Sequence, residues 1–98
     1  MNNMQAMLKQ VKSLQNEMLK VKEDVEKSEF VGECSFVKAI LYGNKKIKSI
    51  EFNCDSLDSD DIKALQDMIV VAVNQAIDNI DSTMERKMSK FGNIPGLF

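Results

Sequence analysis

The sequence predicts an α+β fold of the order α-β-β-β-α, in which a three-stranded antiparallel meander carries two long helices on one face. Three observations predict it: a heptad pattern in the first quarter of the chain, strand-like runs in the middle, and an amphipathic stretch from residue 58 onward. The 98 residues are enough for one domain. We expect residues 1–91 to form this domain and residues 92–98 to form a flexible tail.

The first helix is expected over residues 3–27. Its apolar residues recur at alternating spacings of three and four, which is the seam of a helix that packs against another helix. A helix of this length extends about 38 Å, too far for so small a domain to cover. We therefore expect part of it to protrude, or a second copy of the chain to cover it. The seam consists of Met4, Met7, Val11, Leu14, Met18, Val21 and Val25.

Three short strands are expected after this helix, because the sequence becomes rich in Phe, Val, Ile and Tyr. The third strand alternates apolar and polar residues, with Ile50 and Phe52 on the apolar side. Gly43-Asn44 is a turn signal before it. Short turns join antiparallel neighbours, so the three strands form a meander. The expected strands are 30–34, 36–42 and 47–54.

The second helix is expected to begin near Asp58, where a run of acidic residues suits the N-terminus of a helix. This run, residues 58–61, also resembles the start of a calcium-binding loop. It lacks the central Gly and the closing Glu of such a loop, so we interpret it as a helix cap. Gly92 and Pro95 are expected to end the helix.

The apolar face of the second helix is wide over residues 68–77 and narrow beyond them. A wide face suits a sheet and a partner, whereas a narrow face suits a single helix. Because an odd number of strands separates the two helices, they can run antiparallel. We expect residues 14–25 to lie over the sheet and the helix ends to form a protruding two-helix arm. In that arm Met4, Met7, Leu8 and Val11 would face Ile80, Met84 and Met88.

The net charge of −2 hides an uneven distribution. Residues 55–82 hold seven Asp and a single Lys, whereas residues 1–22, 38–48 and 83–98 are each net positive. The expected arm therefore carries a basic tip away from an acidic body, and two such tips in a twofold dimer could straddle a polyanion. Composition alone would make these residues solubilising surface charges. The candidates for anion binding are Lys9, Lys12, Arg86, Lys87 and Lys90, followed in rank by Lys45, Lys46 and Lys48.

Nothing in the sequence indicates an enzyme. There is no His, no nucleophile beside a base and no Gly-rich phosphate loop, so we predict no catalytic residue, cofactor, metal site or small-molecule substrate. Cys34 and Cys54 are expected to be reduced packing residues, and Asn74 to make a structural hydrogen bond. The longest apolar run, residues 68–73, is far shorter than the ~20 residues that span a bilayer, so a cytosolic protein is expected.

Four segments, in order along nearly the whole chain, resemble those of a known family. They are residues 7–18 (MLKQVKSLQNEM), 36–43 (FVKAILYG), 65–76 (LQDMIVVAVNQA) and 94–98 (IPGLF). Together they resemble the YbaB/EbfC family of bacterial nucleoid-associated proteins. One departure lies between the first two strands, where Cys34-Ser35 replaces the Gly-rich turn usual in that family.

The resemblance implies a homodimer with protruding helical arms that binds double-stranded DNA in the nucleoid, with low or broad sequence preference and no enzymatic activity. The eight basic candidates would then contact DNA phosphates. No aromatic residue interleaves them, so stacking on single strands is not expected. The alternative is a dimeric helical adaptor without direct DNA binding, whose methionines grip other proteins. The heptad spacing of those methionines favours packing within the seam instead.

Overall fold

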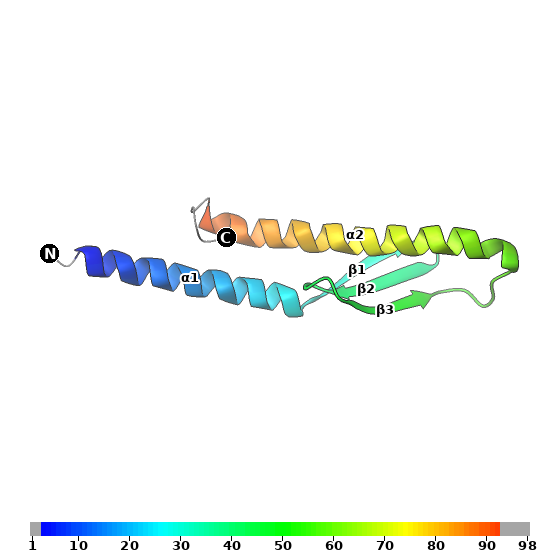
Figure 1. Ribbon diagram of the computed structural model, residues 1–98, viewed down its shortest axis with the longest axis horizontal. Helices are drawn as coiled ribbons and strands as arrows, with labels where there is room; N and C mark the ends of the chain where they lie inside the picture. Colours follow the sequence, from blue (N-terminus) through cyan, green and yellow to red (C-terminus); the bar gives the residue numbers. More distant parts are fainter. Residues whose placement is uncertain (1–2, 93–98) are drawn as a thin grey trace.

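The computed structural model describes residues 3–92 and contains the predicted elements in the predicted order (Figure 1). Of the expected tail, 92–98, all but Gly92 lies outside the described residues. The three strands form one antiparallel sheet in the order β1-β2-β3, which confirms the α+β fold class. The elements are α1 (Asn3–Lys27), β1 (Glu29–Cys34), β2 (Val37–Tyr42), β3 (Ile47–Phe52), a 3₁₀ turn (Ser59–Asp61), α2 (Ile62–Met88) and a second 3₁₀ turn (Ser89–Phe91).

The core lies between α2 and the sheet. Every second residue of the central strand β2 is fully buried, because successive side chains of a strand point to opposite faces and α2 covers one of them. The side chains that meet them from α2 include two alanines, which let the helix lie close to the sheet. The buried cluster consists of Val37, Ala39 and Leu41 from β2 and Ala72, Ala76 and Ile80 from α2.

α2 lies very close to the sheet at Gly32 in β1. A Cβ atom at this position would lie 1.9 Å from the carbonyl oxygen of Ala72 and 2.7 Å from the backbone nitrogen of Ala76. Both are backbone atoms of a helix and cannot move aside independently. Gly32 is therefore required by the contact between two backbones rather than by a turn.

Two side-chain amides of α2 hydrogen-bond to the outer edge of β1. Gln75 Oε1 accepts from the Glu33 N–H (2.6 Å), and Asn79 Nδ2 donates to the Val31 carbonyl oxygen (3.0 Å). An edge strand otherwise leaves such backbone groups available for pairing with another chain. Asn74, for which a structural hydrogen bond was expected, is exposed, and its neighbour Gln75 makes this contact instead.

Both turns lie where they were predicted, but the residue with a positive φ in each turn is neither glycine nor asparagine. Gly43-Asn44 does begin the β2–β3 turn, which is closed by the Tyr42 N–H donating to Lys46 O (2.9 Å). Its last residue, Lys45, has a positive φ of 71°. At the β1–β2 turn, where the Gly-rich segment is missing, Ser35 has φ 55°. Both are left-handed positions that glycine and asparagine prefer.

The placement of α1 differs from the expectation that both helices lie on the sheet. α2 alone covers it, whereas α1 extends beyond the end of the sheet (Figure 1). A single residue, Ser28, joins α1 to β1, and one residue is too short to reverse the chain onto the sheet. The junction is tight: Gly43 N–H donates to Ser28 O (2.9 Å), and a Cβ on Gly43 would lie 1.7 Å from Val25 O.

Helix α1 packs instead along the end of α2, antiparallel to it, in a molecule of 75 × 19 × 15 Å (Figure 1). α2 is ~40 Å long and the strands ~20 Å, so only about half of α2 extends past the sheet. It therefore covers the second half of α1, where Met18 and Val25 are buried. Phe91, which the sequence analysis did not single out, is buried beyond the end of α2.

The first half of α1 protrudes without a partner helix. Met4 and Met7 are 74% and 63% exposed, so they lack the burial that the expected packing against Ile80, Met84 and Met88 would give them. The predicted arm is present, but among residues 3–92 only α1 forms its outer part.

Two smaller expectations have separate outcomes. The cap expected at Asp58 lies on the 3₁₀ turn that precedes α2, where the Asp58 N–H donates to the Asp61 carboxylate (3.0 Å); α2 itself begins at Ile62 without a side-chain cap hydrogen bond from Asp61. Cys34 is half-buried beside the core, as expected of a packing residue, whereas Cys54 is exposed and was assigned wrongly. Cys54 lies after the end of β3, where α2 does not cover the chain.

On the face of the sheet opposite α2, Lys48 of β3 forms an ion pair and hydrogen bond with Glu29 of β1. This contact joins the two outer strands across β2. The hydrogen bond to Glu29, and then its negative charge, raise the pKa of Lys48 above its ordinary value. Both side chains are close to half exposed, so the pair contributes little to stability.

Replacing Gly32 by Ala should destabilise the fold by about 3 kcal/mol or more, because the added methyl meets two backbone atoms of α2. Chemical denaturation monitored by circular dichroism measures this. Val31→Ala, which removes a half-exposed side chain from the same strand, is the matched control and should cost less than ~1 kcal/mol. Equal stability of the two variants would contradict the close contact.

The Lys48–Glu29 pair predicts a pH dependence. Because the pKa of Lys48 is raised in the folded protein, its contribution to stability is complete below the pKa of the unfolded chain and is lost as the pH rises through the folded value. NMR titration of Lys48 Nζ should show this raised pKa, and Glu29→Gln should lower it. An identical titration in both proteins would mean that the pair is absent in solution.

Candidate nucleic-acid interface

The structure divides the eight predicted basic residues into two groups. Five lie toward the end of the molecule that is remote from the sheet, where α2 ends beside the middle of α1 (Figure 1). We call this region the basic arm end. All five side chains are exposed. They are Lys9 and Lys12 on α1, Arg86 and Lys87 in the last turn of α2, and Lys90 in the 3₁₀ turn that follows.

The basic arm end has a clear excess of positive charge. Residues 3–20 and 82–92 hold six cations against only Glu17 and Glu85. The sixth cation is Lys20, an exposed residue of α1 that was not selected as a candidate. Its position in the net-positive section 1–22 of the sequence could have identified it as a candidate. The structure adds that α2 ends alongside this helix.

The C-terminal end of α2 places cations where its own backbone favours them. Arg86 and Lys87 lie in the last turn, at the negative end of the helix dipole. Lys90 Nζ lies 5.0 Å from the centroid of the Phe91 ring, and that ring is buried. A cation–π contact of this kind holds the Lys90 ammonium near the surface that Phe91 covers. These three cations are therefore positioned by local structure and remain open to solvent.

The second group, Lys45, Lys46 and Lys48, lies at the β2–β3 hairpin and is not brought together with the arm end. Lys45 Nζ lies 2.9 Å from Asp81 Oδ1, and Lys48 pairs with Glu29. Two of these three charges are thus already balanced within the chain. Sequence reasoning missed both pairs, because their partners are 36 and 19 residues away.

Acidic residues gather at the opposite end of α2. Asp58, Asp60 and Asp61 surround its start, and all but the half-buried Asp61 are exposed. α2 therefore begins in an acidic region and ends in a basic one. The molecule is electrically polarised along its length, and a polyanion would be attracted to the arm end and repelled from the sheet end.

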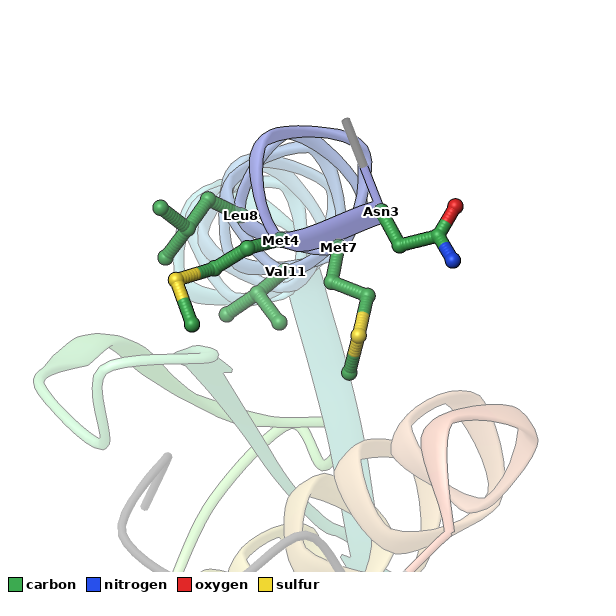
Figure 2. Close-up of a pocket in the computed structure, with 5 residues that line it drawn as sticks. All are labelled: Asn3, Met4, Met7, Leu8 and Val11. Carbon is green, nitrogen blue, oxygen red and sulfur yellow. The ribbon is translucent and has the colours of Figure 1, made fainter. Parts of the chain in front are cut away.

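The remaining surface offers little for chemistry. Within residues 3–92 no group of three or more Cys, Asp or Glu side chains is placed to hold a metal ion. Neither long helix has a stretch apolar enough to cross a membrane. A shallow hollow on the arm is lined by four apolar side chains and Asn3, none of them titratable (Figure 2). It is suited to packing and not to catalysis.

Comparisons with known proteins confirm the resemblance seen in the sequence. The sequence profile of the YbaB/EbfC DNA-binding family matches residues 1–94. Two proteins of Streptococcus pneumoniae, from strains Hungary19A-6 and ATCC BAA-334 / TIGR4, are both named nucleoid-associated protein. Each is 39% identical over 98 residues, covering 97% of this chain and 99% of its own. A DNA-binding family agrees with the expectation that this protein is not an enzyme. The chain belongs to the YbaB/EbfC DNA-binding family.

Proposed function

We propose that this protein is a nucleoid-associated protein that, as a homodimer, grips double-stranded DNA with its basic arm ends. The observation that carries the proposal is the separation of charge along the molecule, with exposed cations at the arm end and acids at the sheet end. The names of the relatives support a place in the nucleoid. Lys9, Lys12, Arg86, Lys87 and Lys90 are the proposed DNA contacts. In the second rank Lys46, which has no ion pair within residues 3–92, comes ahead of Lys45 and Lys48.

The chemistry of these residues suits phosphate contacts. Each Lys or Arg that neutralises a phosphate releases condensed counterions, which gives affinity independent of sequence. Phosphate contacts fix the position of a protein on DNA but do not read its bases. An interface made of such cations therefore supports low or broad sequence preference.

The proposed dimer would cover apolar surface that one chain leaves open. α2 lies over β1 and β2, and two large side chains of β3 remain exposed: Ile47 at 54% and Phe52 at 43%. Phe52 is paired with Val37 and Ile47 with Leu41, so both point to the face of the sheet that holds the core. This half of that face is apolar and is not covered by any part of residues 3–92.

The neighbouring flank of α2 is apolar too. Val70, Val73 and Ile77 follow the i, i+3, i+7 spacing of one helix face, and Asp81 continues it. Asp81 contacts Lys45 of the β2–β3 turn, so this flank of α2 is the one beside β3. We group this flank with Ile47 and Phe52 as the β3–α2 surface, which we assign to a second copy of the chain.

The competing function is that of a dimeric helical adaptor that does not bind DNA directly. The observation in its favour is the exposed Met4 and Met7 on the arm, since methionine adapts to varied partners. Both functions use the same dimer, so a direct DNA-binding measurement distinguishes them.

DNA binding should weaken steeply with salt. We expect log K for a mixed-sequence duplex to fall linearly with log [NaCl] in a fluorescence anisotropy titration. Lys87→Ala with Lys90→Ala should reduce the magnitude of the slope by about 2 per bound protomer, because two phosphate contacts are lost. Duplexes of different sequence should bind with similar affinity.

Lys63→Ala is the matched control for this titration. Lys63 is exposed on α2 but lies at its acidic start, so its removal should leave the slope unchanged. If the unmodified protein binds no duplex even at low salt, the DNA-binding proposal fails and the adaptor function remains.

Dimerisation should depend on the β3–α2 surface. Val70→Glu places a charge in this surface and should give a monomer in sedimentation velocity at micromolar concentration. Val71→Glu is the control, because Val71 is similarly exposed, at 51% against 57%, but points away from β3. Sedimentation of the unmodified protein as a monomer, or an equal effect of both substitutions, would contradict this assignment.

A further inference from the structure

The outer part of α1 carries an apolar stripe that nothing in residues 3–92 covers. Met4, Met7, Leu8 and Val11 follow the i, i+3, i+4, i+7 spacing of one helix face, and each is between 49% and 74% exposed. They line the hollow seen along the axis of α1 in Figure 2. We call these four residues the arm stripe. A helix face that is exposed to water does not need apolar residues at this spacing. The arm stripe therefore indicates that another segment covers this face.

Toward its N-terminus, the apolar seam of α1 becomes exposed to solvent. This change occurs beside the place where the described part of the chain ends, after α2. Leu14 and Met18 are covered, whereas Val11 and the residues before it are exposed. The cover comes from the end of α2, after which Phe91 is buried. Gly92 follows with φ 67°, a left-handed conformation that ends the helical path. The chain therefore leaves α2 beside the start of the uncovered stripe.

Residues 93–98 have the length and composition to continue this cover. The segment NIPGLF holds three large apolar residues, Ile94, Leu97 and Phe98, and no charged side chain. Pro95 disfavours helix for the residue before it and favours an extended path. Six extended residues reach about 20 Å, whereas Leu14 and Met4 are separated by about 15 Å of helix. The segment can therefore reach every residue of the arm stripe.

We propose that segment 93–98 of the same chain docks along the arm stripe, with its apolar side chains against Met4, Met7, Leu8 and Val11. A second copy of the arm is a poorer occupant, because it would bring the cations of two arm ends together, whereas this segment brings no charge. A tethered segment also acts at an effective concentration of about millimolar, which a separate chain does not reach. The inference does not depend on DNA binding.

Hydrogen exchange measured by mass spectrometry tests the docking. In the full chain the backbone amides of residues 4–11 should be protected, and Leu97→Ser with Phe98→Ser should raise their exchange by about tenfold or more. Asn93→Ser is the control and should change nothing, while exchange in the core segment 72–80 should be the same in all three proteins. Unchanged exchange in 4–11 after the double substitution would overturn the proposal.

Disulfide trapping decides whether the segment belongs to the same chain. Leu8→Cys with Leu97→Cys, in a background of Cys34→Ser and Cys54→Ser, should oxidise to a disulfide within one chain, seen as a monomer in denaturing non-reducing electrophoresis with no free thiol. Ala6→Cys with Leu97→Cys is the control, because Ala6 lies on the opposite side of α1 from the stripe, and should stay reduced. A disulfide-linked dimer would assign the stripe to a second copy and overturn the proposal.

Discussion

α2 can lie against β1 only because Gly32 has no side chain, and the rest of the molecule depends on this contact. It brings the backbone at Ala72 and Ala76 onto the sheet and so fixes where α2 sits along its length. The residues of α2 after Ile80 must then extend past the sheet, where they meet α1. The amides of Gln75 and Asn79 hold the same register from the side, by bonding to the edge of β1. The arm therefore results from the position that α2 takes along the sheet.

The short connection at Ser28 gives the arm its direction. Because one residue joins α1 to β1, the helix points away from the sheet, and Gly43 lets the hairpin turn pack directly on the end of the helix. The N-terminal lysines are consequently carried away from the acidic start of α2, while the end of α2 brings Arg86, Lys87 and Lys90 toward them. A chain with net charge −2 in this way presents a positive end to a polyanion.

The sequence was sufficient for the elements but not for all of their contacts. Hydrophobic periodicity and turn residues predict the helices, the meander and the Gly43 turn, because these patterns report local geometry. A seam such as Met4 to Val25 reports that a helix face is covered, but not by which partner, and the placement of α1 was therefore missed. Gln75 and Asn79 look like solvated helix residues until β1 is placed beside them. The cations at the arm end were found from charge distribution, whereas the pairing of Lys45 with Asp81 required the fold.

Two of the apolar surfaces left uncovered by residues 3–92 lie in separate places, and this separation matters for function. The β3–α2 surface lies beside the sheet, whereas the arm stripe lies beyond the end of α2. If two copies met only through a twofold contact at the sheet, the two arms of the dimer would not touch each other. An anion can lie between the arms only if they are apart in this way. An arm that kept its stripe exposed would instead associate through that stripe, against the repulsion of its own lysines. Covering the stripe from within the chain removes this competition, so that the arm surface remaining for a partner is the charged one.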